Sequence, residues 1–440
     1  MHTKSSTQWS RPSAFNASRI FSVLPSALLF FAVPMSAAHA QDNPPCADAW
    51  AAATPYNGGD ASSESGLNYQ ANWWTKGDDP ATHSGASGSG QPWTSQGPCD
   101  AGPGDPADDS IFKNGFDSAG GPLPQGFLFS PYKDVTINLN WNTNVMQTAV
   151  TGVAIPLVGS GSLVSTVEPN LRAITLAFAT GECGNESWGG ISPTSFIDAN
   201  IHALSAAGVY YVVSTGGAAG VFTCGSAGGM AQFIAKYDTA HLFGIDFDIE
   251  GGQSPAQISA LVAGAAAAEQ AYPNLRFSFT LATLAASDGS YGGLNSLGDT
   301  AVRAIQASSL QNYTVNLMVM DFGGASPGVC VVSAGACNMG QSAIQAAINL
   351  EHTYGIPASK IELTPMIGMN DVSSEIFTTA DVDTVMNYAA AQSLAGVHYW
   401  SLDRDTPCAG NPGSASATCN SVSGTSPLQY MDGFLQHVAN

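Results

Sequence analysis

The chain has 440 residues, 44% of them hydrophobic and only 10% charged, and its 33 acidic and 12 basic side chains leave a formal net charge of −21. Such a length predicts roughly two to three domains, with enough apolar residues for a sizeable core. The low charge density is unlike that of a disordered acidic chain. The net negative charge disfavours polyanionic partners, so we expect neither nucleic acid nor an anionic membrane surface.

Residues 1–40 have the composition of a secretory signal peptide. Their only charged side chains are basic, an apolar run covers 20–34, and Ala38-His39-Ala40 places small residues at −3 and −1 of a cut. An uncleaved membrane anchor is the alternative, but prolines interrupt the run, which is short for a membrane span. We therefore expect a secreted, extracellular protein that is cleaved near Ala40 and has no membrane-embedded part.

The eight cysteines are even in number, and none forms a Cys-x-x-Cys pair of the kind that zinc sites use. Disulfides in an oxidising compartment are therefore favoured, and we expect no metal and no cofactor. Pairing between sequence neighbours is the most economical arrangement, although the sequence alone leaves other connectivities open. The expected bonds are Cys46–Cys99, Cys183–Cys224, Cys330–Cys337 and Cys408–Cys419.

Residues 42–99 form a short, turn-rich region that is unusually aromatic. Its aromatic side chains are too many for so small a region to bury, and they include Trp50, Tyr56, Tyr69, Trp73, Trp74 and Trp93. We expect an exposed aromatic face that stacks on the apolar faces of sugar rings. On a strand, the adjacent Trp73 and Trp74 would point to opposite faces, so that one packs and one meets the ligand.

Residues 100–124 are rich in Gly, Pro, Asp and Ser, which predicts a flexible linker. From 125 to 440 the chain alternates apolar strands with longer, alanine-rich helical stretches. The strands are almost continuously apolar, as strands covered on both faces are; they are expected at 126–130, 173–179, 209–214, 242–249, 276–281, 315–320, 361–366 and 396–401. Helices are expected at 255–271, 341–354 and 380–394. This order predicts an α/β fold, a (β/α)8 TIM barrel, with a doubly wound open sheet as the alternative. No glycine-rich nucleotide motif supports that alternative.

The fourth expected strand carries a row of acids, Asp246, Asp248 and Glu250, at alternate positions. Alternate residues share a face, so these side chains line the barrel interior about 6–7 Å apart, with Glu250 at the open end. Like charges raise a carboxyl pKa, so Glu250 can stay protonated and donate a proton while Asp248 stabilises positive charge. That division of labour suits cleavage of a glycosidic bond. A metal site and a structural acidic network remain open alternatives.

The row resembles the DxxDxDxE signature of family 18 glycoside hydrolases, the retaining chitinases, with Phe243 in place of the first acid. Four further segments resemble motifs of that family in the same order: Ser214–Gly217 on strand three, Met318–Gly323 on strand six, Met366–Asp371 on strand seven and Tyr399–Asp405 on strand eight. The resemblance covers nearly all of 126–410.

The resemblance implies a substrate-assisted mechanism, in which the 2-acetamido oxygen of the sugar attacks its own anomeric carbon and forms an oxazolinium ion. Glu250 would be the acid and then the base, Asp248 would orient the acetamido group, and Asp246 would exchange a proton or hydrogen bond with Asp248. Contacts with the sugar are expected from Trp400, Asp321, Met318, Asn370, Tyr399 and Gly217. Many members have a tyrosine where this chain has Met320, so we expect either that another group, Asn370 or Tyr399, replaces it or that activity is reduced.

Residues 42–99 resemble the carbohydrate-binding family 5/12 modules attached to chitinases, through a pattern that includes Tyr69, Trp73 and Trp74. The resemblance implies a small all-β module that binds insoluble chitin through these side chains. We therefore expect a monomeric, endo-acting chitinase whose partners are chitin and chitooligosaccharides. The alternatives are a chitin-binding lectin with an inactive barrel, an endoglycosidase acting on glycoprotein N-glycans, and a metal-dependent hydrolase.

Overall fold

A computed structural model describes residues 44–64, 67–80, 83–85, 90–99, 126–225, 227–410 and 413–438. The expected signal peptide and the whole of the expected linker, 100–124, lie outside these residues. Contacts divide the chain into two compact units, 1–108 and 109–440. Within the described residues, no helix is long and apolar enough to cross a membrane.

The first unit contains a three-stranded antiparallel sheet of β1 (Ala61–Glu64), β2 (Leu67–Ala71) and β3 (Trp93–Pro98). The Cys46–Cys99 disulfide joins the beginning and the end of the described part of this unit. Its small core consists of Tyr56, Tyr69, Ala71 and Trp93. Tyr69 is thus a core residue, which contradicts its expected place on the binding face.

The tryptophan pair follows β2 rather than lying on a strand, so the expected alternation does not apply to it. Trp73 is 48% exposed and Trp74 is 62% exposed. Both rings are therefore exposed at the surface of this unit, and the expectation that one of them packs inward applied only to a strand.

The second unit is built around a curled parallel sheet. Its strands in spatial order are β8 (Ala173–Glu182), β10 (Tyr210–Gly216), β12 (Leu242–Ile249), β13 (Arg276–Ala282), β14 (Tyr313–Met318), β17 (Ile361–Thr364), β20 (Gly396–Val397) and β4 (Leu128–Phe129). Shortly after β4, β5 (Tyr132–Asp134) pairs in parallel with β8, so the segment 128–134 closes the ring. The expected parallel strands are therefore present as a curled sheet.

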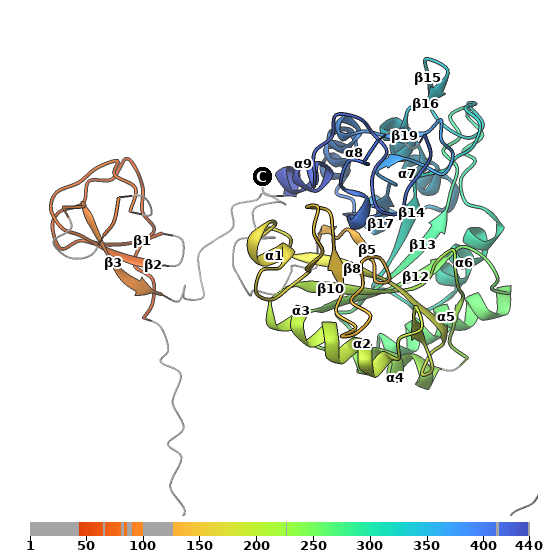
Figure 1. The fold of residues 1–440 in the computed structure, drawn as a ribbon, viewed down its shortest axis with the longest axis horizontal. Helices are drawn as coiled ribbons and strands as arrows, with labels where there is room; N and C mark the ends of the chain where they lie inside the picture. The colour runs from red at the N-terminus through yellow and green to blue at the C-terminus, as the bar shows by residue number, and fades with distance from the viewer. Residues whose placement is uncertain are drawn as a thin grey trace, which may run out of the picture. The chain divides into compact units, whose positions relative to one another are not determined.

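Helices follow the strands in the order expected of a barrel, and Figure 1 shows them around the strands of this unit. They are α1 (Leu163–Thr166), α2 (Pro193–Phe196), the π-helix η1 (Ile197–Ile201), α3 (His202–Ala206), α4 (Ala227–Tyr237), α5 (Pro255–Ala268), α6 (Ser296–Ala307), α7 (Met339–Tyr354), α8 (Thr379–Gln392) and α9 (Gln429–Val438). The start of α5 shows the local cause: Ser254 and Gln257 form a capping box, and Pro255 occupies the first turn.

Short elements decorate the ends of the barrel strands. Three pairs of two-residue strands are β6 (Gln147–Thr148) with β7 (Ile155–Pro156), β15 (Val332–Ser333) with β16 (Ala336–Cys337), and β18 (Gly368–Met369) with β19 (Ile376–Phe377). Two more short strands, β9 (Ser187–Trp188) and β11 (Phe222–Thr223), pair with β8. Single 3₁₀ turns are η2 (Ala358–Lys360) and η3 (Leu402–Arg404). Disulfides Cys183–Cys224, Cys330–Cys337 and Cys408–Cys419 join neighbouring loops. With Cys46–Cys99, all four predicted pairings are confirmed.

Helix α9 docks over a cluster of buried carboxyl groups. The side chain of Asp405 accepts hydrogen bonds from the backbone N–H groups of Tyr430 (3.1 Å) and Met431 (2.8 Å) at the start of the helix. Burial, then the charges of Asp432 and Asp405, raise the pKa of Glu168 from 4.5 to about 7. These acids therefore tie the docking of α9 to pH.

We expect the raised pKa of Glu168 to make the protein less stable as pH rises. Because the folded state holds the proton more tightly than the unfolded state, the stabilisation is complete below about pH 4.5 and is lost towards about pH 7. Denaturant unfolding from pH 4 to 8 should show this loss in the wild type and a shallower one in Glu168→Gln. The exposed Glu351→Gln is the control, and parallel curves for wild type and Glu168→Gln would contradict the expectation.

Candidate active site

Strand β12 presents the predicted acids on the inner face of the barrel. Asp246 and Asp248 are buried, and Glu250, the residue after the strand, is half-buried. Ile245, Phe247 and Ile249 belong to the hydrophobic core on the other face. The predicted alternation of the strand is therefore confirmed.

Hydroxyl groups surround Asp246. Its carboxylate accepts hydrogen bonds from Ser214 Oγ (2.6 Å), Thr280 Oγ1 (2.7 Å) and the Tyr132 hydroxyl (3.0 Å). Burial raises the pKa of Asp246, and these three donors oppose that effect because they favour the charged form. Asp246 is thus buried, but three protein hydroxyl groups supply the hydrogen bonds that water would otherwise make to its carboxylate.

Asp248 has a different environment. Its Oδ1 is buried and finds no hydrogen-bond partner among the residues that the structure describes. Burial, then the charges of Glu250 and Asp246, raise the pKa of Asp248 well above its usual value. The hydroxyl donors favour the charged form of Asp246. Where Asp246 and Asp248 share one proton, we therefore place it on Asp248. A buried oxygen without a hydrogen-bond partner costs folding free energy. Such an oxygen is expected where a bound ligand donates the missing hydrogen bond.

Glu250 lies at the mouth of the row. Burial raises its pKa, the backbone N–H of Ala218 partly offsets that effect by hydrogen bonding, and the charge of Asp321 raises the pKa further. A carboxyl group with a raised pKa and partial exposure is suited to donate a proton to a bound molecule.

A cavity of about 320 Å³ opens above the row at the carboxyl ends of the strands. It is lined by Tyr132, Asp134, Phe178, Ala218, Ala219, Asp248, Glu250, Thr280, Met318, Met320, Asp321, Thr364, Met366, Asp371 and Trp400. The structure thus brings Asp248, Glu250, Met318, Asp321 and Trp400 together, as predicted. Among the described residues, no group of His, Cys, Asp and Glu is arranged to hold a metal ion.

Trp400 forms one aromatic wall of the cavity. Its ring stacks on Phe178, with centroids 5.6 Å apart and planes 18° apart, and its centroid lies 6.1 Å from that of Tyr132. A ring held from one side presents a fixed flat surface, which is what stacking on a sugar requires.

Gly216 and Gly217 let two strands approach each other. A Cβ atom on Gly216 would lie 2.2 Å from the carbonyl oxygen of Asp248, and one on Gly217 would lie 2.7 Å from the ring of Phe178. Gly217 also donates a backbone hydrogen bond to the Asp248 carbonyl oxygen (3.2 Å). Gly217 is therefore a support of the acid row, and it does not line the cavity.

Asp321 is held by the segment that follows β17. Its backbone has φ +52°, and its Oδ1 accepts from the N–H of Val372 (2.8 Å). The carboxylate of Glu375 accepts from the next two N–H groups, of Phe322 (3.0 Å) and Gly323 (2.8 Å). Glu375 thus positions the Asp321 turn.

Besides Gly217, two further predicted sugar contacts do not reach the cavity. Asn370 is fully buried, and its amide donates to the carbonyl oxygens of Met366 (2.8 Å) and Gly368 (3.1 Å). Tyr399 is also fully buried, and its ring stacks on Phe434 of α9, on the outer side of the strand. Neither can take the place of the tyrosine that Met320 replaces.

Several groups of the site were not predicted from the sequence, chiefly Tyr132, Thr280, Phe178 and Asp134. The inward position of Thr280 could have been predicted, because β13 alternates polar Arg276, Ser278 and Thr280 with apolar residues, as β12 does. Tyr132 lay beyond the expected first strand, which the structure continues as β5.

Comparison with known proteins agrees with this geometry. No protein-family model matches the chain. A "probable bifunctional chitinase/lysozyme" of Escherichia coli is 26% identical over 432 aligned positions, which cover 82% of this chain and 45% of that protein. "Endochitinase 11" of Metarhizium anisopliae is 27% identical over 267 positions, covering 54% of this chain and 49% of that protein. The chain thus spans about half the length of these relatives.

The crystal structure of the catalytic domain of a hyperthermophilic chitinase from Pyrococcus furiosus aligns with 72% of this chain and 97% of its own, at 24% identity and a TM-score of 0.55. The chain has the fold of a chitinase catalytic domain. The named relatives and this structural neighbour are chitinases.

Proposed function

We propose that this protein is a family 18 chitinase that hydrolyses β-1,4 bonds between N-acetylglucosamine units with retention of configuration. The observation that carries the proposal is the unpartnered Oδ1 of Asp248, next to Glu250 in the cavity. A bound 2-acetamido group would supply the missing N–H donor. The names of the relatives support the choice of substrate.

In the proposed mechanism, each acid has its own step. Glu250 donates its proton to the leaving oxygen while the acetamido oxygen attacks the anomeric carbon, and an oxazolinium ion forms. Asp248 accepts the acetamido N–H, and Asp246 takes over the proton of the pair, so that negative charge faces the ion. Glu250, now ionised, removes a proton from the water molecule that attacks the anomeric carbon and opens the oxazolinium ring. Trp400 supports the sugar from below.

Substrate assistance predicts that the acetamido group is indispensable. Wild type should cleave chitohexaose, whereas the fully deacetylated glucosamine hexamer should be cleaved at least about a thousandfold more slowly, because it lacks the internal nucleophile. Mass spectrometry of the products over time provides the measurement. Comparable rates on both oligomers would exclude the mechanism.

Endo cleavage is the second part of the proposal. Between β17 and β20 the structure places only the β18–β19 pair and α8, so no inserted domain walls the cavity on that side. One relative is named an endochitinase. Mixed products from the first turnovers of chitohexaose would support endo action, and chitobiose alone would contradict it.

The first unit is proposed to anchor the enzyme on insoluble chitin through Trp73 and Trp74. We expect the double substitution of both residues by alanine to reduce binding to insoluble chitin by about tenfold or more, because two exposed aromatic platforms are lost. Hydrolysis of soluble chitohexaose should not change. Unchanged sedimentation of the variant with chitin would remove these residues from the binding face.

Secretion is also proposed, with removal of residues 1–40. Terminal sequencing of the mature protein should then begin near Gln41. A lectin-like protein with an inactive barrel is the less favoured function, because the acids at 246, 248 and 250 are all present and face the cavity or its base.

A further inference from the structure

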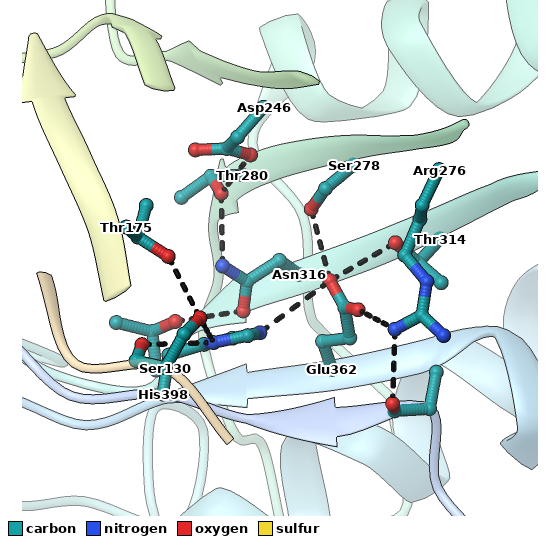
Figure 2. Close-up of polar contacts among 12 residues, drawn as sticks. Ser130, Thr175, Asp246, Arg276, Ser278, Thr280, Thr314, Asn316, Glu362 and His398 are labelled. Atoms are coloured by element: carbon teal, nitrogen blue, oxygen red, sulfur yellow. Dashed lines mark hydrogen bonds and ion pairs between the residues drawn. The ribbon is translucent and has the colours of Figure 1, made fainter. Parts of the chain in front are cut away.

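A second charged cluster lies inside the barrel at the base of the acid row. Glu362 of β17 pairs with Arg276 of β13, Oε1 to Nη1 at 2.7 Å, and with His398, Oε2 to Nε2 at 3.6 Å. Figure 2 shows these three side chains converging from β13, β17 and the segment after β20, with Asp246 on the far side of Asn316. The Glu362 and His398 side chains are almost completely buried.

Hydrogen bonds fix Glu362 as an anion. Its Oε2 also accepts from Ser278 Oγ and Thr314 Oγ1, each at 2.9 Å. Burial raises the pKa of Glu362, but the hydrogen bond from His398 and the charges of Arg276 and His398 outweigh it and bring the pKa to about 2. Glu362 therefore stays negative over the whole working range of a protein.

The same cluster adjoins Asp246. Glu362 and Asp246, each only 1% exposed, line one pocket of about 10 Å³, and Asn316 projects between them, donating to Thr280 Oγ1 (2.9 Å). That volume admits about one water molecule, so bulk solvent does not screen the two carboxylates. The charge of Glu362 accordingly raises the pKa of Asp246.

The titratable and charged groups that face Asp246 come from five strands: Asp248 and Glu250 from β12 and its end, Tyr132 from β5, Arg276 from β13, Glu362 from β17 and His398 after β20. Strands β8, β10 and β14 present Thr175, Ser214 and Asn316 at this level, with Tyr210 of β10 at the base. Of these groups, Glu362 is the acid contributed by a strand other than β12.

We propose that Glu362, held by Arg276 and His398, is a positioning residue that keeps a proton on the Asp246–Asp248 pair and thereby sets the acidic limit of the enzyme's pH range. This rests on the proposed function. The chain has Phe243 where the family signature has its first acid, and the Arg276 guanidinium lies over that ring at 4.8 Å. The third buried carboxylate is thus supplied from β17 instead of β12.

The sign of the effect follows from charge. The acidic limb of the pH–rate profile reports uptake of a second proton by the pair, which removes the negative charge that faces the oxazolinium ion. The anion Glu362 favours that uptake, and the cation Arg276 opposes it. Removing the charge of Glu362 and removing the charge of Arg276 should therefore move the acidic limb in opposite directions.

The test is the pH dependence of kcat/KM on chitohexaose in matched variants. Glu362→Gln should move the acidic limb down by about half a pH unit or more, and Arg276→Gln should move it up. The charge-neutral double variant and Glu362→Asp should both return close to wild type. Glu186→Gln, which removes another buried carboxylate paired with a lysine, Lys236 at 3.0 Å, should leave the limb unmoved.

A purely structural role would lower kcat without moving the limb, and that result would overturn the proposal. Infrared titration of the protonated carboxyl band, assigned with Asp246→Asn, gives a readout that needs no activity. Its midpoint should fall in Glu362→Gln, and an unchanged midpoint would also overturn the proposal. If wild type cleaves no chitooligosaccharide, the proposed function fails, and this titration still decides the role of Glu362.

Discussion

Glu250→Gln is expected to lower kcat for chitohexaose by about a thousandfold or more. The amide keeps the shape of the side chain but has no acidic proton to give to the leaving oxygen. KM should change little, because the cavity wall formed by Trp400 and the methionines is untouched. Steady-state kinetics with circular dichroism as a check of folding provides the measurement.

The matched control for that variant is Glu351→Gln, an exposed glutamate on α7, which should retain wild-type kcat. A fall of less than about tenfold in Glu250→Gln would remove Glu250 from the role of acid. An equal fall in the control would indicate general damage to the protein instead.

Lys133→Met is expected to destabilise the barrel by about 3–5 kcal/mol. Lys133 Nζ lies 2.6 Å from Asp403 Oδ2, both side chains are fully buried, and Nζ also donates to the carbonyl oxygens of Asp134 and Ile137. Removing the cation leaves a buried carboxylate with little compensation. Guanidinium unfolding followed by tryptophan fluorescence provides the measurement.

The control for Lys133→Met is Arg303→Met on α6. Arg303 pairs with Asp299, and both side chains are exposed. Surface pairs contribute little, so the control should unfold like wild type. The double variant Lys133→Met with Asp403→Asn should recover a large part of the loss, because no unpaired charge remains. If Lys133→Met unfolds at the wild-type midpoint, the pair does not stabilise the barrel.

The acid row could be predicted from the sequence because the decisive rule is local. Alternation along one strand is enough to place Asp246, Asp248 and Glu250 on one face. The same rule, applied to 398–400, places His398 and Trp400 inward and Tyr399 outward, as the structure has them. The expectation that Tyr399 contacts the sugar came from the family motif and not from this rule, and it was wrong.

Other parts of the site depend on contacts between distant strands. Glu362 meets Arg276 and His398 only because the sheet curls and closes, so no pattern near residue 362 identifies its partners. Asn370 lies in a turn whose direction depends on the β18–β19 pair, so the family motif alone did not show that its amide faces the backbone. Tyr69 packs inward because the first unit needs a core, and an aromatic count cannot distinguish core from platform.

The most direct test of the account is the anomeric configuration of the first product. Wild-type protein is mixed with chitohexaose in deuterated buffer, and proton NMR spectra are recorded before mutarotation equilibrates the reducing ends. Assistance by the acetamido group predicts that the new reducing ends appear as the β-anomer and only later relax towards α. First-formed α-anomer would mean direct attack by water, and would contradict the roles given to Asp248 and Glu250.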